Sequence, residues 1–261
     1  MHEQTERLLL ERHAEGAVLL LRLNIPEKLN ALATPFLREI ADVLVDAEGD
    51  EAIRVVVITG SEKVFAAGAD INELYNSDGT EPIDSPRFNA WRDIRRFAKP
   101  LIAAIEGWCL GAGTELLMCA DIAIAGDKAR IGLPETNLGI IPGAGGTAIL
   151  PRLVGRALAL QMVLTGEPIS PVDAKSAGLL AQVVTAGQAL PTALDLASRL
   201  SQRAPLALVA AKASIRDAQE LPLEQHMRAE RQRFIDLLAT ADKKEGIDAF
   251  REKREAVWRN R

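Results

Sequence analysis

The chain has 261 residues, of which 48% are hydrophobic and 26% charged, and its net charge is -5 at pH 7. Such a chain is globular and long enough for one large domain. The negative charge and an aromatic content of only 4% argue against a dedicated nucleic-acid binder. No apolar stretch approaches the roughly 20 residues that span a bilayer. No secretory or transit signal is visible either, so we expect a cytoplasmic protein without a membrane partner.

The first two-thirds of the chain alternates short apolar runs with segments of helical periodicity. Strands are predicted over residues 17–23, 53–59, 101–105 and 121–125, and helices over 35–45 and 86–97. The turn-rich segment 76–86 is expected to be a loop. Continuous apolar strands separated by helices are typical of α/β proteins with covered sheets. A doubly wound sheet and a spiral of β/α units both fit this pattern.

From about residue 191 onward the pattern is helical throughout. Helices are predicted over 205–218, 222–238 and 247–258, each beginning near a proline or after a glycine. We therefore divide the chain into a core, 1–195, that carries the active site and a C-terminal helical region, 196–261. Phe250 and Trp258 are apolar anchors of the last helix. The pattern alone does not decide whether they cover the chain's own core or a neighbouring subunit.

Cysteine and histidine usage points away from disulfides and metals. Cys109 and Cys119 lie in apolar surroundings, so we expect buried free thiols in a reducing compartment. The histidines His2, His13 and His226 are far apart in sequence and have no metal-ligand spacing. We therefore expect no metal site.

Two glycine-rich turns each follow an apolar run. They are FAAGADINEL, residues 65–74, and CLGAGTE, residues 109–115. Gly68 allows a sharp turn, and Asp70 with Glu73 resembles a capping box that begins a helix. Because amides at a helix start lack intrahelical acceptors, Ala69 and Ala112 are candidate donors to an anionic oxygen. An ordinary strand–turn–helix explains either segment alone, but two convergent amides would form an oxyanion hole.

Two glutamates stand among apolar neighbours. Glu115 is followed by Leu-Leu-Met, and Glu135 lies in LPETNLGIIPGAGGT, residues 133–147. A buried carboxylate is costly unless it has partners, so Glu115 either faces solvent or is held in a site. The alternative interpretation of Glu135 is an ordinary solvated glutamate in a loop. The run GAGGT lacks the ending of a phosphate-binding P-loop, and GAGTEL lacks the third glycine of a dinucleotide fingerprint.

Five segments of the sequence, taken together, are highly specific for one protein family. They are IPEKLNAL (25–32), FAAGADINEL, KPLIAAIEGWCLGAGTELLMCADIAIAG (99–126), GLPETNLGIIPGAGGT (132–147) and EGIDAFREKR (245–254). With them the chain resembles the enoyl-CoA hydratase (crotonase) family over nearly its whole length. The resemblance implies an α/β fold, a crotonase-like spiral of ββα units with a C-terminal helical region, in homotrimers or hexamers. It also implies syn addition of water to a 2-trans-enoyl-CoA in fatty-acid or aromatic-acid catabolism. No cofactor is implied besides the coenzyme A thioester substrate.

The resemblance assigns site residues position by position. The catalytic glutamates fall on Glu115, which holds and activates water, and Glu135, the main acid/base. The oxyanion amides fall on Ala69 and Ala112, where the family often has glycine at the second position. Ala148 stands where many hydratases have glutamine. The implied contacts to coenzyme A and the acyl chain are Lys28, Leu29, Ala31, Ala67, Gly68, Asp70, Ile71, Leu74, Trp108, Gly111, Leu133, Leu138, Gly143, Phe250 and Lys253, the last two reaching a neighbouring subunit's ligand.

Other functions of the same fold stay open. An isomerase moves a double bond with one carboxylate, and the presence of both glutamates disfavours it. An RNA-binding relative needs a basic helix face, whereas the segment 34–51 is acidic on balance. An inactive scaffold would not need the two glutamates. The chain is also similar to bacterial catabolic hydratases, including those that act on an unsaturated dicarboxylic acyl-CoA, but the sequence does not fix the acyl group.

Overall fold

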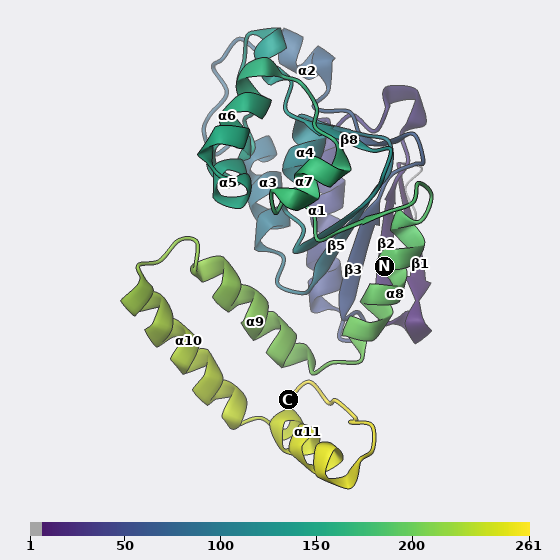
Figure 1. The fold of residues 1–261 in the computed structure, drawn as a ribbon, viewed down its shortest axis with the longest axis vertical. Coiled ribbons are helices and arrows are strands. Elements are labelled where there is room, and N and C mark those ends of the chain that lie inside the picture. Colours follow the sequence, from purple (N-terminus) through teal and green to yellow (C-terminus); the bar gives the residue numbers. More distant parts are fainter. Residues whose placement is uncertain (1–6) are drawn as a thin grey trace.

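Two β-sheets form the centre of the molecule, and the computed structural model describes them within residues 7–261 (Figure 1). The larger sheet has the strand order β1-β2-β3-β5-β7-β9, and the smaller one has the order β4-β6-β8. All pairs are parallel except β1 with β2. The strands of the larger sheet are β1 (Leu8–His13), β2 (Val18–Leu23), β3 (Val55–Thr59), β5 (Leu101–Ile105), β7 (Ile122–Gly126) and β9 (Gln182–Val184); those of the smaller are β4 (Val64–Ala66), β6 (Trp108–Leu110) and β8 (Arg130–Gly132).

Strands of the two sheets alternate along the chain. β3 is followed by β4, β5 by β6 and β7 by β8, and a helical segment follows each pair. This repetition is a spiral of ββα units, so of the two architectures that the periodicity left open, the spiral is the one present. The helical segments are α1 (Thr34–Gly49), α2 (Ile71–Asn76), α3 (Pro86–Arg96), α4 (Ala112–Leu117), α5 (Gly146–Val154), α6 (Arg156–Thr165), α7 (Pro171–Ser176) and α8 (Ala189–Ser201), with 3₁₀ turns η1 (Ala14–Gly16), η2 (Pro26–Lys28) and η3 (Glu135–Leu138).

The larger sheet is covered on both faces. Every residue of β3 and β5 is buried, as expected of parallel strands between two helical layers. Val56 and Ile58 share a core cluster with α1 and α3. Val55 and Val57 belong to a second cluster, in which α8 supplies Ala193 and Ala197. The predicted strands and helices of this region are confirmed to within a few residues.

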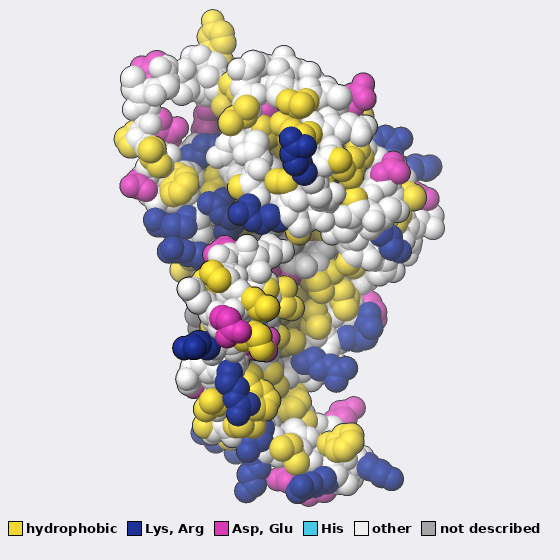
Figure 2. Space-filling view, turned by 60° about the vertical axis from the view of Figure 1, so that its left-hand side comes forward, with side chains coloured by type: hydrophobic (Ala, Val, Ile, Leu, Met, Phe, Trp, Pro, Cys, Tyr) yellow, Lys and Arg dark blue, Asp and Glu magenta, His cyan; other side chains and the backbone are white. Residues whose placement is uncertain are grey.

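An arm of three helices extends from the core (Figure 1). It consists of α9 (Pro205–Asp217), α10 (Leu223–Leu238) and α11 (Ala241–Glu252). Lys212 anchors α9, because its ammonium lies 2.7 Å from Asp121 Oδ2 and donates to the Lys99 carbonyl. α10 has no buried residue, and hydrophobic side chains are exposed along the arm (Figure 2). The predicted division into 1–195 and 196–261 stays a prediction, and its boundary falls inside α8.

The last helix differs from the sequence prediction, which put it at 247–258. It begins at Ala241, because the hydroxyl of Thr240 accepts a hydrogen bond from the Lys243 amide. It ends at Glu252, because Lys253 adopts a left-handed conformation with φ 55°. Lys253 is therefore the residue after the helix, not a helical residue. Trp258 lies beyond the helix, where its Nε1 donates to the Gln202 carbonyl and its ring packs on Gly246.

None of the helices within residues 7–261 is long and apolar enough to cross a bilayer. Cys109 and Cys119 are buried free thiols, as predicted. No cluster of three or more His, Cys, Asp and Glu side chains suited to a metal occurs in this part of the chain. His2 lies outside the described residues.

Candidate active site

The carboxyl edge of the smaller sheet gathers three loops. Because β4, β6 and β8 are parallel neighbours, the segments that follow them leave the sheet on the same side. A Cβ atom on Gly111 would lie 3.5 Å from the Gly68 Cα and 2.9 Å from Oε1 of Glu135. Gly111 also has φ 53°, so a side chain is excluded there by both space and conformation. The two glycine turns and Glu135 therefore meet at one point.

Backbone amides at this point are available to a ligand. Ala112 is the first residue of α4, and Ala69 precedes Asp70, the N-cap of α2. Among residues 7–261, neither amide donates to a protein acceptor. Such free donors at helix starts suit an oxygen that gains negative charge. Ala112 has helical backbone, so alanine is accommodated where the family often has glycine.

Glu115 is held in a buried clamp. Thr114 fixes the start of α4, since its hydroxyl lies 2.7 Å from the Cys109 carbonyl and 2.8 Å from that of Gly132. The side chain of Glu115 next to it is only 3% exposed. Its Oε1 accepts hydrogen bonds from the amides of Ala144, at 2.6 Å, and Gly146, at 2.9 Å. A Cβ on Gly146 would lie 2.5 Å from Pro142, so glycine is required for this approach. Glu115 is thus held in a site and does not face solvent.

Glu135 has a different environment. It begins η3, and its Oε2 is buried without a hydrogen-bond partner among the described residues. Burial, assisted by the negative charge of Glu115, raises the pKa of Glu135 to about 7. Burial also raises the pKa of Glu115, but the amides of Gly146 and Ala144 oppose that shift by stabilising the carboxylate. At neutral pH the pair therefore suits one proton-accepting and one proton-donating carboxyl group.

Several predicted ligand contacts gather beside the glycine turns. The Ala67 amide donates to the Leu29 carbonyl at 3.0 Å, which joins the segment 28–31 to the first turn. Lys28 lies 3.4 Å from Oδ2 of Asp70, and Asp70 caps α2 through the amides of Asn72 and Glu73. Glu73 does not return to Asp70 but accepts from Thr34, so the capping box is only half formed. The apolar side chains of Ile71, Leu74, Trp108 and Leu138 are exposed.

Three predicted contacts lie elsewhere. Leu133 is completely buried and belongs to the hydrophobic core. Phe250, 85% exposed, and Lys253 lie at α11, at the opposite end of the molecule from α4 (Figure 1). This chain does not bring them to its own site. Their assignment to a neighbouring subunit's ligand stays a prediction.

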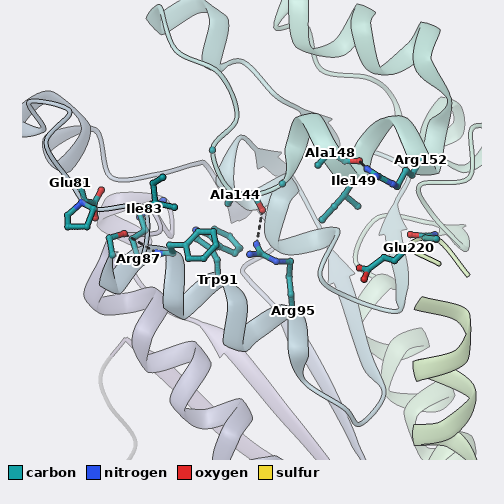
Figure 3. A pocket seen from close by; sticks show the side chains of 16 residues that line it. Glu81, Ile83, Arg87, Trp91, Arg95, Ala144, Ala148, Ile149, Arg152 and Glu220 are labelled. Atoms are coloured by element: carbon teal, nitrogen blue, oxygen red, sulfur yellow. Dashed lines mark hydrogen bonds between the residues drawn. The ribbon is translucent and has the colours of Figure 1, made fainter. Parts of the chain in front are cut away.

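A cavity of about 730 Å³ adjoins the Glu115 clamp (Figure 3). Its walls are α3, the loop before it, the segment from Gly143 into α5, and residues 219–220 after α9. Gly143, a predicted ligand contact, lines this cavity, whereas α3 and the amides that hold Glu115 were not predicted to belong to the site. The sequence signal for these amides is the run GAGG at 143–146, which resembles a phosphate-binding loop. The anion that this glycine-rich loop binds is a side chain of the same protein.

Comparisons with known proteins agree on one family. Residues 13–261 match the family described as enoyl-CoA hydratase/isomerase. The 2,3-dehydroadipyl-CoA hydratase of Escherichia coli is 46% identical over 94% of this chain and 96% of its own length. A probable enoyl-CoA hydratase of Rhizobium meliloti is 40% identical over 98% and 99%. The crystal structure of an enoyl-CoA hydratase subunit I from Geobacillus kaustophilus superposes with a TM-score of 0.94, at 36% identity, over 99% of this chain and 100% of that one.

Proposed function

The chain belongs to the enoyl-CoA hydratase/isomerase family, and from that premise we propose that Glu115 and Glu135 add water across the 2,3 double bond of a 2-trans-enoyl-CoA. The product is the 3-hydroxyacyl-CoA. Enoyl-CoA hydration is the enzymatic activity, and the proposal concerns the residues that perform it. It rests mainly on the contrast between Glu115, held by two backbone amides, and Glu135, whose Oε2 has no hydrogen-bond partner among the described residues and whose pKa is raised to about 7.

The reaction divides between the amides and the two carboxyl groups. The thioester oxygen accepts hydrogen bonds from Ala69 and Ala112, which stabilise the enolate charge by about 2.7–4 kcal/mol per donor. Glu115 takes a proton from water as the water oxygen bonds to the β-carbon. Glu135 gives its proton to the α-carbon. Both protons then re-equilibrate with solvent, so the cycle consumes only water and needs no metal or redox cofactor.

Coenzyme A binds beside the first glycine turn in this proposal. Lys28 lies beside Asp70, the residue after Ala69, and it meets the negative charge of the coenzyme A phosphates locally. The exposed apolar side chains of Leu29, Ile71 and Leu74 supply a surface for the adenine and pantetheine portions. We also propose a cytoplasmic location, which the two buried free thiols support.

A direct assay tests the activity. The protein is expected to convert trans-2-butenoyl-CoA to 3-hydroxybutanoyl-CoA, followed by the loss of the ultraviolet absorbance of the conjugated thioester. An isomerase would instead convert a 3-enoyl-CoA to the 2-enoyl isomer without forming the hydroxy product. Isomerisation without hydration in the same preparation would contradict the proposal.

The same assay run across pH tests the proton donor. Glu135 must be protonated to act as the acid, so kcat/KM should be highest below its pKa and fall as pH rises through about 7. Glu115→Gln removes a negative charge that raises this pKa. The alkaline limb of the residual activity should therefore move to lower pH. An alkaline limb that stays in place would show that Glu115 does not act on the titrating group.

The arm supports an oligomer. It exposes Leu223, Met227, Phe234, Ile247 and Phe250, a set of large apolar side chains that a lone chain leaves in water. We expect a homotrimer or a hexamer in solution. Multi-angle light scattering measures the mass directly, and a monomeric mass at micromolar concentration would rule this expectation out.

The acyl group is a separate question. The Escherichia coli relative is named for 2,3-dehydroadipyl-CoA, whose acyl chain ends in a second carboxylate. The relatives of this chain therefore include a hydratase named for a dicarboxylic enoyl-CoA.

A further inference from the structure

The cavity beside the Glu115 clamp presents one face of α3. Arg87, Trp91 and Arg95 are spaced four residues apart, so their side chains lie in a row along the helix. Figure 3 shows Trp91 between the two arginines, with Arg95 directed toward Ala144. We call these three residues the α3 row.

The row consists of hydrogen-bond donors. Arg87 uses Nη1 to donate to the Leu32 carbonyl at 2.9 Å and lies 3.6 Å from Glu73, which leaves its other N–H groups available. Arg95 donates to the Ala144 carbonyl at 3.0 Å and has no carboxylate within ion-pair distance among residues 7–261. Trp91 is only 2% exposed, and its Nε1 has no acceptor in the same part of the chain.

A buried hydrogen-bond donor without an acceptor costs free energy. A ligand that brings an acceptor to this wall of the cavity would recover that cost. The acidic side chains of the cavity, Glu81 and Glu220, are exposed and form no ion pair with the row within the described residues. The remaining lining includes Ile83, Phe88 and Ile149, which suit methylene groups. The cavity thus combines apolar side chains with the guanidinium donors of Arg87 and Arg95. That combination fits a short aliphatic chain that ends in an anion.

Ala144 connects the row to the catalytic carboxylates. Its amide donates to Glu115 and its carbonyl accepts from Arg95. The charges of Arg87 and Arg95 also act on Glu115, where they oppose the burial that raises its pKa. In a six-carbon chain, three single bonds of about 1.5 Å each separate the β-carbon from a terminal carboxyl carbon. The terminal carboxylate therefore lies only a few bonds from the reacting carbon, and Ala144 alone stands between Glu115 and Arg95 as their shared hydrogen-bond partner.

We propose that the α3 row binds the terminal carboxylate of a dicarboxylic 2-enoyl-CoA and makes it the preferred substrate. This inference rests on the proposed hydratase function, because it places the β-carbon between Glu115 and Glu135. An uncharged chain of the same length would leave the donors of the row without an acceptor. Sites built to hydrogen-bond a polar group discriminate strongly against analogues that lack it.

The test compares 2,3-dehydroadipyl-CoA with trans-2-hexenoyl-CoA, which has the same number of acyl carbons and no terminal carboxylate. The wild-type protein should have the higher kcat/KM for the dicarboxylic substrate. Arg95→Met should lower the ratio of the two kcat/KM values by about 10- to 100-fold, the effect of one hydrogen bond to a charged group. Arg87→Met should act in the same direction, and the double variant should lower the ratio further.

The matched control is Arg96→Met, which removes an exposed arginine from the same helix that does not line the cavity. It should keep the wild-type ratio. An effect on coenzyme A binding would lower kcat/KM for both substrates alike and leave the ratio unchanged. If Arg87→Met fails to fold because the hydrogen bond to Leu32 is lost, the kcat/KM ratio of Arg95→Met is sufficient to test the proposal.

A wild-type preference for hexenoyl-CoA, or an Arg95→Met variant with the wild-type ratio, would overturn the assignment of the row while the hydratase activity stands. Failure to hydrate either substrate would instead overturn the proposed function, and this inference with it.

Discussion

Glu135→Gln should lower the rate of enoyl-CoA hydration by about 10²–10⁴-fold, the usual contribution of a positioned general acid. The amide has the size and shape of the carboxyl group, but it cannot deliver a proton to the α-carbon at a useful rate. Oε2 of Glu135 has no protein partner among the described residues, so the substitution breaks no hydrogen bond at that atom. The effect should therefore appear in turnover and not in folding.

Acyl-CoA binding separates this outcome from a general loss of the site. Calorimetric titration with a saturated acyl-CoA should give a similar Kd for the wild type and Glu135→Gln. Glu62→Gln is the matched control, since Glu62 is exposed and lies far along the chain from the clamp. If Glu135→Gln turned over at the wild-type rate, the proton to the α-carbon would have to come from another group.

Glu115→Gln should also lower the rate of hydration, by about 10²-fold or more, but for a different reason. The glutamine carbonyl can still accept from the amides of Ala144 and Gly146, so the clamp persists while the base is lost. Exchange of the α-proton needs the oxyanion amides and Glu135 but no water at the β-carbon. This variant should therefore retain exchange of the α-protons of a saturated acyl-CoA in deuterated water.

The exchange measurement assigns the two roles. Glu115→Gln should exchange the α-proton and Glu135→Gln should not. The opposite pattern, with exchange surviving only in Glu135→Gln, would mean that the roles are reversed. Because both glutamates serve the same addition reaction, the double variant should lose less than the product of the two single effects.

The sequence predicted the strands of the larger sheet because long β-branched runs such as that of β3 have no competing helical pattern. It missed β4, β6 and β8, which have three residues each. Three residues are too short for a periodicity to be detected. The convergence of the two glycine turns was nonetheless expected, because each turn follows an apolar segment and precedes a helix start.

The last helix shows a different limit. Gly246 was taken as the residue before the helix, but it lies inside α11, where the ring of Trp258 packs against it. The cap that sets the true start is Thr240, whose neighbours have no apolar period to mark it. The start of this helix is thus set by a side-chain cap that lies well before residue 247, the position at which the prediction began it.

The hydrogen bonds that hold Glu115 could not be predicted from the sequence for a related reason. Which way the amides of Ala144 and Gly146 point depends on how the chain after η3 returns over α4, and no local pattern specifies that path. The cavity was missed because Arg87 and Arg95, read along the sequence, look like the solvated face of a helix. Only tertiary packing places them over Ala144.

Both donors of the proposed oxyanion hole are main-chain groups of residues that are already alanine. An alanine-scanning survey would therefore pass over the centre of the reaction and register only its surroundings. Natural variation is equally uninformative at such positions, because exchange among small residues leaves the N–H in place. What selection maintains there is a backbone path, and that path is encoded at a distance, in the glycines that permit the turns and the threonine that fastens α4 to the strand ends. Inherited loss of activity would be expected to appear at those supporting residues before it appeared at the alanines themselves.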